Sequence, residues 1–548
     1  MSQTIINRIE ESIRNNWERQ ALTDFNGVSF QYRDIARKVA KLHILFENAK
    51  VRKGDKIAIC GKNSSQWVVA FIASVTYGAV TVPILHEFKA DNIHHLMAHS
   101  EAKLLFIEDA IWENLDPEYM PDLQGAVKLG DFSLLMSRDP ELTMAREHLN
   151  EMFGKKYPER FTPDDVVYHH PEPDEVMLIN YTSGSTGFSK GVMLCYSSIW
   201  SNVEYCIKWI KFLEPGDSLV CMLPLAHMYG LSMEMIFPFV QGCHLYFLTR
   251  VPSPRVILEA FATVKPKLII TVPLIIEKIV KTKIFPKLET PTMKVLLRLP
   301  IIDDRILAKV NQGLIDAFGG NVHEIIVGGA GLNQEVEEFL MRIGFPITTG
   351  YGMTECGPLI SYAPASIHRL RSCGRCVDRM ECRIDSPDPE NIPGELQVRG
   401  MNVMKGYFKN PEATESVFKD GWMSTGDLCT MDSEGFIFIR GRNKNMILGP
   451  SGQNIYPEEI EQKLNNLPYV GESIVVEKGG RLVALIYPDI EIATKDGVIS
   501  NIEKIMEDNV NELNKELPAY SQITKPIVHY QEFEKTPKRS IKRYLYQD

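Results

Sequence analysis

Residues 181–191 form a segment rich in hydroxyl groups and glycine, with the sequence Tyr-Thr-Ser-Gly-Ser-Thr-Gly-Phe-Ser-Lys-Gly. The apolar residues Met177–Asn180 before it predict a strand. Glycines let the backbone bend so that its N–H groups converge on an anion, while the hydroxyl groups add donors and Lys190 adds a positive charge. The segment therefore predicts a phosphate-binding loop with contacts from Thr182, Ser183, Gly184, Ser185, Thr186 and Gly187.

This loop is not a Walker A motif, because G-x-x-x-x-G-K-[ST] fits no register across it. Considered alone, it leaves a second reading open, namely a polar surface loop that binds nothing. The other segments of the chain must decide between the two.

Residues 349–355, Thr-Gly-Tyr-Gly-Met-Thr-Glu, are the second segment whose side chains suit a nucleotide. Tyr351 offers an aromatic face to a planar ring, and Thr354 offers a hydroxyl group to a phosphate. Glu355 offers a hard oxygen ligand for Mg²⁺. Gly350 and Gly352 do not make a Rossmann fingerprint, because the third glycine is misplaced and no acidic residue follows at the right distance.

Three weaker segments could complete such a site. His227 closes the run Leu223–His227 at the end of a predicted strand. Small residues follow another predicted strand and leave room for a flat ring; they are Gly328, Gly329 and Ala330. Asp427 could accept hydrogen bonds from two sugar hydroxyl groups, and Arg442 could reinforce them. Each has an ordinary alternative: a structural histidine, a tight turn, a turn aspartate and a surface arginine.

Together and in this order, the segments resemble the signatures of the adenylate-forming (AMP-binding) superfamily, which includes acyl-CoA ligases, peptide-synthetase adenylation domains and luciferases. The loop matches T-S-G-S-T-G-x-x-K-G, with Ser189 where the family usually has proline. The runs Gly328–Asn333 and Phe533–Tyr546 look most like bacterial long-chain fatty acyl-CoA ligases.

The resemblance implies an acid–thiol ligase that uses ATP, CoA and Mg²⁺ and acts on medium- to long-chain fatty acids. A carboxylate would attack the α-phosphate of ATP to give acyl-AMP and pyrophosphate, and CoA would then form the thioester and release AMP. The implied roles are catalysis for Lys190, His227 (in the carboxylate pocket), Thr354 and Glu355, adenine binding for Gly329, Ala330, Tyr351 and Gly352, ribose binding for Asp427 and Arg442, and Mg²⁺ binding for Thr186 and Glu355.

One segment departs from the family, whose members usually carry a lysine near the C-terminus in a motif like T-x-x-G-K-I-x-R. Residues 536–543 read Thr-Pro-Lys-Arg-Ser-Ile-Lys-Arg, with Ser540 in the place of that lysine. Losing one such stabilising group costs on the order of 10²–10³ in rate. Lys538 and Lys542 flank Ser540 and share its face if the segment is extended. Either is a candidate replacement after a backbone shift of roughly 6–7 Å.

Two rival functions stay open. The first is an acyl-AMP ligase that loads a carrier protein acting in trans. The second is a degenerate adenylate-binding protein that lacks the first half-reaction because of Ser540. The presence of Lys190, Glu355, Asp427 and Arg442 argues against the second, since these residues would serve little purpose without ATP.

Composition restricts the partners. The 548 residues carry a net charge of −10, which argues against nucleic acid as the main partner. We expect small molecules instead (a carboxylic acid, ATP and CoA), a monomer or homodimer, and at most peripheral membrane contact.

The N-terminus has no signal-peptide pattern and the ten cysteines are scattered, which is typical of a cytoplasmic protein with reduced thiols. The C-x-x-C of Cys373 and Cys376 lacks a second ligand pair for zinc.

Short apolar strands alternate with helical segments, which predicts an α/β fold with largely parallel, buried strands. The expected strands are 56–60, 79–85, 103–107, 218–223, 244–248, 267–272 and 323–327. The uncharged stretch 67–85 could in principle span a membrane, but it divides into a helix, Ser65–Tyr77, and the strand 79–85. A helix is also expected at Asn333–Ile343, with Asn333 as its cap.

The pattern changes near Gly394, where antiparallel strands are expected at Gly394–Arg399 and Phe436–Arg440. We therefore predict a large multi-layer N-terminal domain, residues 1–441, with mostly parallel sheets and a β-rich subdomain at about 360–441. A small mobile α+β domain, residues 442–548, follows a hinge near Lys444. It should contain a helix opened by Pro457, a hairpin at residues 479–480 and a helix near 498–517.

Overall fold

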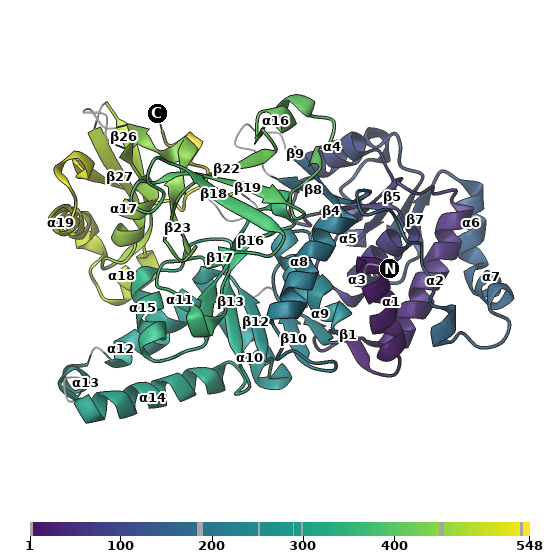
Figure 1. Cartoon of the computed structure of the whole chain (residues 1–548), viewed down its shortest axis with the longest axis horizontal. Coiled ribbons are helices and arrows are strands. Elements are labelled where there is room, and N and C mark those ends of the chain that lie inside the picture. The colour runs from purple at the N-terminus through teal and green to yellow at the C-terminus, as the bar shows by residue number, and fades with distance from the viewer. Residues whose placement is uncertain are drawn as a thin grey trace.

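The N-terminal part of the chain is built on mixed and parallel sheets with helices packed against them (Figure 1). The computed structural model describes residues 4–182, 190–249, 253–288, 290–296, 300–448, 454–479, 481–536 and 541–547.

The largest sheet has eight strands in the order β20-β9-β8-β4-β3-β5-β6-β7. Their bounds are β3 Lys56–Cys60, β4 Val80–Ile84, β5 Ala102–Ile107, β6 Gly125–Lys128, β7 Leu134–Ser137, β8 Val176–Thr182, β9 Lys190–Cys195 and β20 Gly406–Tyr407. The inner strands β3, β4, β5, β6 and β8 are parallel, whereas β7 pairs antiparallel with β6, β9 with β8, and β20 with β9. The inner strands read as continuous apolar runs because both of their faces are buried.

Two smaller sheets contain further strands of the N-terminal part. One has the order β10-β11-β1-β2, with β1 Gln20–Asp24, β2 Ser29–Gln31, β10 Ser218–Cys221 and β11 His244–Phe247. The other is parallel, with the order β12-β13-β14 and the bounds Leu268–Thr271, Glu324–Val327 and Ile347–Thr349. The predicted site residues His227, Gly328 and Gly350 follow the carboxyl ends of β10, β13 and β14, where ligands bind in open parallel sheets.

The β-rich region follows β14. It holds β15 Tyr351–Gly352, β16 Leu359–Tyr362 and β17 Arg375–Cys376 in one antiparallel sheet. A second antiparallel sheet joins β18 Met380–Asp385, β19 Gly394–Gly400, β21 Phe418–Lys419, β22 Trp422–Met431 and β23 Ile437–Arg442. The pairing of β22 with β23 brings Asp427 opposite Arg442.

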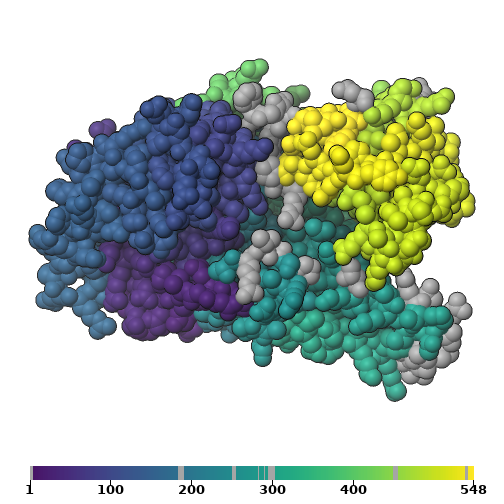
Figure 2. All heavy atoms as spheres, turned by 180° about the vertical axis from the view of Figure 1, so that it is seen from behind, coloured from purple at the N-terminus to yellow at the C-terminus, as the bar shows by residue number. Residues whose placement is uncertain are grey.

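A separate C-terminal domain follows, with the sheet β26-β27-β28 and its own apolar core. Its bounds are β26 Val470–Lys478, β27 Arg481–Pro488, β28 Lys525–Val528, α17 Pro457–Leu464 and α19 Ile502–Asn514. In the space-filling view it forms its own lobe, coloured yellow and yellow-green (Figure 2). Helix α17 faces the N-terminal part, where Gln462 donates to the backbone oxygen of Leu332 at 3.1 Å.

The α/β fold class predicted from the sequence is confirmed. The expected strands fall within about one or two residues of their predicted ends, and the predicted helix Ser65–Tyr77 is α3, capped by the Ser64 hydroxyl. Asn333 caps α15, Gln334–Arg342, through its side chain. Helix α19 is shorter than predicted, because residues 499–501 form a 3₁₀ turn and the chain before Pro518 is pushed out of the helical region.

No helix in the described residues is both long enough and apolar enough to cross a membrane. All ten cysteines are free thiols.

Candidate active site

The predicted phosphate loop lies between two paired strands. Strand β8 ends at Thr182 and β9 begins at Lys190, and these two residues are partners in the antiparallel ladder. The ladder therefore fixes the position of Lys190 at the loop's exit. The loop residues Ser183, Gly184, Ser185, Thr186 and Gly187 lie outside the described residues.

Tyr407 connects Lys190 with Glu355. The Lys190 ammonium lies 4.8 Å from the centroid of the Tyr407 ring, a cation–π distance. The Tyr407 hydroxyl donates to Oε1 of Glu355 at 2.9 Å. Burial raises the pKa of Tyr407, with the Glu355 carboxylate as the next cause, so the hydroxyl stays a donor at neutral pH.

Tyr407 was missed in the sequence, because 217 residues separate it from Lys190 and 52 from Glu355. It reaches both through the pairing of β20 with β9, in which Tyr407 faces Val192. No spacing rule links these three residues, and Gly406-Tyr407 has no distinguishing pattern of its own.

Glu355 is the predicted Mg²⁺ ligand that lies within the described residues. It lies half-buried in a short 3₁₀ turn, Thr354–Cys356, in which Thr354 is buried. One carboxylate is enough for Mg²⁺, which keeps several waters and takes further oxygens from substrate phosphates. Among the described residues, no group of three His, Cys, Asp or Glu side chains could hold a metal by itself. Thr186, the other predicted ligand, lies outside the described part of the chain.

The predicted sugar site is assembled around Asp427. The Tyr351 hydroxyl donates to Oδ2 of Asp427 at 2.6 Å, and Nε of Arg442 lies 3.2 Å from Oδ1. Asp427 is buried, which raises its pKa, while Arg442 and Tyr351 act in the opposite direction. The Arg442 side chain is 71% exposed and can move toward a ligand. These three predicted residues therefore form one connected group.

An apolar chamber begins beside this group. Its lining includes Gly328 and Gly329 after β13, and Gly350, Tyr351 and Gly352 after β14. Gly329 has a positive φ of 87°, and a Cβ at Gly328 would come within 2.8 Å of the Tyr229 ring, so both positions require glycine. Ala330 is exposed and does not line the chamber.

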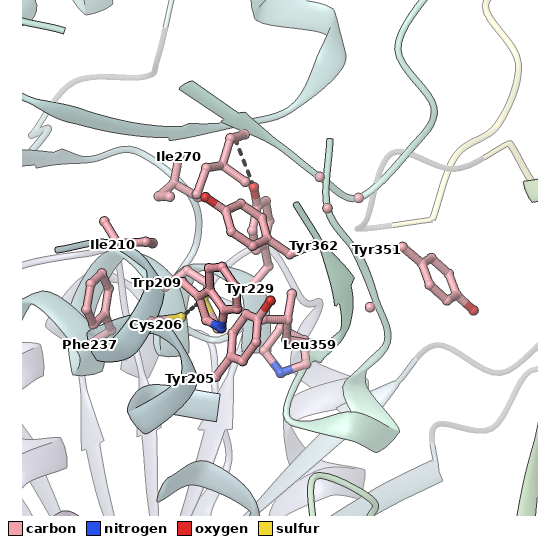
Figure 3. A pocket seen from close by; sticks show the side chains of 17 residues that line it. Tyr205, Cys206, Trp209, Ile210, Tyr229, Phe237, Ile270, Tyr351, Leu359 and Tyr362 are labelled. Atoms are coloured by element: carbon pink, nitrogen blue, oxygen red, sulfur yellow. Dashed lines mark hydrogen bonds between the residues drawn. The ribbon is translucent and has the colours of Figure 1, made fainter. Parts of the chain in front are cut away.

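The body of the chamber is made of aromatic and aliphatic side chains. Figure 3 shows Tyr205, Trp209, Tyr229 and Tyr362 gathered together, with Tyr351 apart from them at the other end. The empty space amounts to about 660 Å³ including the open mouth. None of the described residues that line it is charged.

The loop that carries His227 is held by three polar side chains. Asn63 donates to the backbone oxygen of Leu223 at 2.7 Å, and Asn180 donates to that of Ala226 at 2.8 Å. The buried Glu234 carboxylate accepts the backbone N–H groups of residues 222 and 223 at 3.0 and 2.8 Å. His227 itself is half-buried.

Glu234 belongs to the π-helical segment Gly230–Ile236, which also supplies Met233 to the chamber. Such segments are rare and occur often at functional sites. Burial raises the pKa of Glu234 well above its usual range.

Of the two candidate lysines in the C-terminal segment, Lys542 is among the described residues. The Lys542 ammonium pairs with the Glu534 carboxylate at 3.2 Å, within the C-terminal domain. Arg543, the next residue, forms an ion pair with Glu461 of α17. Lys538 and Ser540 lie outside the described residues.

Comparison with known proteins agrees with this geometry. The model of the AMP-binding enzyme family matches residues 9–408, and that of the AMP-binding enzyme C-terminal domain matches residues 444–547. The chain is 28% identical over 451 residues to the long-chain-fatty-acid–CoA ligase FadD15 of Mycobacterium bovis, covering 78% of this chain and 71% of that one. It is 27% identical over 501 residues to the long-chain-fatty-acid–CoA ligase of Escherichia coli O157:H7, covering 86% and 83%.

Solved structures show the same fold. ATP-bound MatB from Rhodopseudomonas palustris superposes with a TM-score of 0.78 at 21% identity, covering 100% of this chain and 98% of that one. A Mycobacterium tuberculosis fatty acyl CoA synthetase superposes with a TM-score of 0.67 at 19% identity, covering 99% and 97%. The family match extends over most of the sequence, and the chain belongs to the AMP-binding enzymes.

Proposed function

We propose that this enzyme is an ATP-dependent acyl-CoA ligase for medium- to long-chain fatty acids. The first half-reaction joins the acid to ATP, giving acyl-AMP and pyrophosphate, and the second transfers the acyl group to CoA and releases AMP. One observation carries the proposal: an apolar chamber without a charged side chain among its described lining residues shares Tyr351 with the connected group of Tyr351, Asp427 and Arg442. An alkyl chain and a nucleotide would meet where these two features join.

In the first half-reaction, separate groups of residues bind the adenine, the ribose and the phosphates of ATP. Tyr351 and the backbone at Gly329 and Gly352 hold the adenine, and Asp427 and Arg442 hold the ribose. Thr182, the 183–187 loop, Lys190 and Thr354 hold the phosphates. Negative charge grows on the phosphate oxygens as the carboxylate attacks, so fixed donors and cations lower the barrier there. Tyr407 keeps Lys190 and Glu355 at a fixed separation on its two sides.

Glu355 would hold Mg²⁺, together with Thr186 of the phosphate loop, and the ion would neutralise charge on the phosphates when bound. The carboxylate fits this role, because its oxygens are hard ligands and it lies beside the Tyr407–Lys190 pair.

His227 would face the reacting carboxylate. The three side chains that fix its loop support this, since a group that positions a carboxylate needs a rigid backbone.

The second half-reaction would use a rotation of the C-terminal domain. We place the boundary at residues 441–442, with the hinge at Lys444 in the short 3₁₀ turn Asn443–Asn445. The ion pair of Lys542 with exposed Glu534 is within the moving domain, so it does not prevent Lys542 from replacing the lysine missing at Ser540. Lys538 is the other candidate.

Pyrophosphate–ATP exchange tests the proposal directly. Purified protein with Mg²⁺ should catalyse exchange in the presence of saturated acids of medium and long chain but not acetate. Absence of exchange with every acid from acetate to stearate contradicts it. Synthetic acyl-AMP supplied with CoA then distinguishes an enzyme that has lost the first half-reaction, which still forms the thioester, from a degenerate binder, which does not. Thioester formed only with an acyl-carrier protein indicates the carrier-loading alternative.

A further inference from the structure

The apolar chamber, which we call the acyl chamber because the proposed function assigns it to the acyl group, has exposed lining residues in two places. Most of its lining residues are buried or half-buried. The exposed ones at the nucleotide end are Gly329 and Gly352. Away from Tyr351, within the aromatic group of Figure 3, Trp209 is 42% exposed although its side chain lines the same chamber. The lining of the chamber is therefore exposed both beside the nucleotide site and at Trp209.

The wall behind Trp209 is rigid. Tyr362 is buried, and its hydroxyl donates to the buried Glu324 carboxylate at 2.7 Å. Tyr205 meets Tyr362 edge to face, with ring centroids 6.3 Å apart and an interplanar angle of 90°. Glu324 also accepts the backbone N–H of Ala365 at 2.6 Å, which fixes the carboxylate itself. These groups cannot move without breaking buried hydrogen bonds.

Trp209 differs from that wall in its position and its contacts. It is the last residue of α8, Tyr196–Trp209, and its ring centroid lies 6.0 Å from that of Tyr205. The ammonium of its exposed neighbour Lys208 lies 5.7 Å from the centroid of the indole ring. Among the described residues that line the chamber, Trp209 is thus the one aromatic side chain that is exposed rather than buried or half-buried.

We propose that Trp209 is the outer stop of the acyl chamber and sets the upper chain length of the unbranched fatty acids that this enzyme adenylates. The inference rests on the proposed function. The aromatic and aliphatic lining suits an alkyl chain, and the lack of charge among its described residues disfavours an acid with a second charged group at its far end.

If Trp209 is the outer stop, kcat/KM should rise with the chain length of the acid up to one particular acid and not beyond it. We call this point the break. While the methyl end stays inside the chamber, each added methylene should raise kcat/KM about fourfold, the equivalent of ~0.8 kcal/mol for a buried CH₂. The gain should stop at the acid whose end reaches Trp209. Replacing the indole by a methyl group removes this stop, because the buried hydrogen bonds of the neighbouring wall keep it from closing over the space.

Exchange kinetics with even-numbered saturated acids from hexanoate to eicosanoate test this. In Trp209→Ala the break should move to longer acids, with shorter acids changed less than threefold, and Trp209→Phe should move it in the same direction by less. Lys208→Ala is the matched control: it removes the adjacent exposed side chain, which does not line the chamber, and should leave the break in place.

The two proposals fail in distinguishable ways. If the wild-type protein exchanges with no acid, the proposed function is wrong. If the wild type shows exchange but the break is unchanged in both Trp209 variants, or moves equally in Lys208→Ala, then only the role of Trp209 is wrong. Because Trp209 is partly exposed, its variants should keep the melting temperature of the parent within a few degrees, and Trp209→Phe remains informative if the alanine variant does not fold.

Discussion

Tyr407 gives the sharpest test of how the site is assembled. Tyr407→Phe removes the hydroxyl that donates to Glu355 at 2.9 Å but keeps the ring beneath the Lys190 ammonium. A hydrogen bond to a charged group is worth about 1.5–3 kcal/mol, and each 1.4 kcal/mol is a factor of ten in rate. If Glu355 depends on this bond for its position during adenylation, kcat/KM for ATP should fall by roughly 10- to 100-fold.

The assay is pyrophosphate–ATP exchange with a saturating fatty acid, measured beside thioester formation from synthetic acyl-AMP and CoA. The second reaction does not need the phosphates of ATP, so Tyr407→Phe should slow it by less than threefold. Tyr407→Leu removes the ring as well and should slow exchange further, because Lys190 then loses its aromatic contact.

Tyr196→Phe is the matched control. It deletes another buried tyrosine hydroxyl, one that donates to the backbone oxygen of Val75 at 2.8 Å away from the site residues. Both variants should lose similar stability, but only Tyr407→Phe should lose exchange activity. The reasoning is refuted if Tyr407→Phe exchanges at the wild-type rate, or if Tyr196→Phe loses as much.

Three further predictions concern charge. Burial raises the pKa of Asp427, so the ionised form that accepts ribose hydroxyls should be lost at a higher pH than for an exposed aspartate. The KM for ATP should therefore rise on acidification. The variant Asp427→Asn should have a higher KM for ATP at neutral pH, and this KM should respond less to pH. Burial raises the pKa of Glu461 from 4.5 to about 7, so the stability that its protonated form contributes is present below pH 4.5 and is lost as pH rises through 7. In Glu461→Gln the melting temperature of the C-terminal domain should depend less on pH across this range. An unchanged dependence of the melting temperature on pH contradicts the assignment. If Lys538 or Lys542 replaces the lysine missing at Ser540, then Lys538→Met or Lys542→Met should slow exchange on the order of 10²–10³-fold. Neither lysine is the substitute if both variants keep the parent rate.

Local sequence patterns were enough to predict most of the fold. Strand β3 matches its predicted bounds, because a buried parallel strand is a short continuous apolar run between turn residues. Asn333 was recognised as a cap because capping depends on its own side chain and the residues directly after it. The π-helical segment Gly230–Ile236 could not be predicted, since it depends on how Glu234 meets the end of β10 rather than on local periodicity.

The site was only partly accessible from the sequence. Asp427 and Arg442 carry recognisable flanking residues, and the structure brings them together through one strand pair. Tyr407 has no such flanking pattern, because its role comes from the pairing of β20 with β9. The chamber could not be predicted from the sequence either. Its walls come from α8, the π-helical segment, β12, β13 and β16, so no single segment of the sequence contains its lining residues.

The most direct test of the central claim is the conversion of ATP to AMP by the purified enzyme with palmitate and CoA, with the acyl product identified by mass. The structure and its family predict AMP, pyrophosphate and palmitoyl-CoA in equal amounts, with no AMP formed when palmitate is left out. ATP turnover that is independent of the acid, or AMP formed without a CoA thioester, would contradict the account.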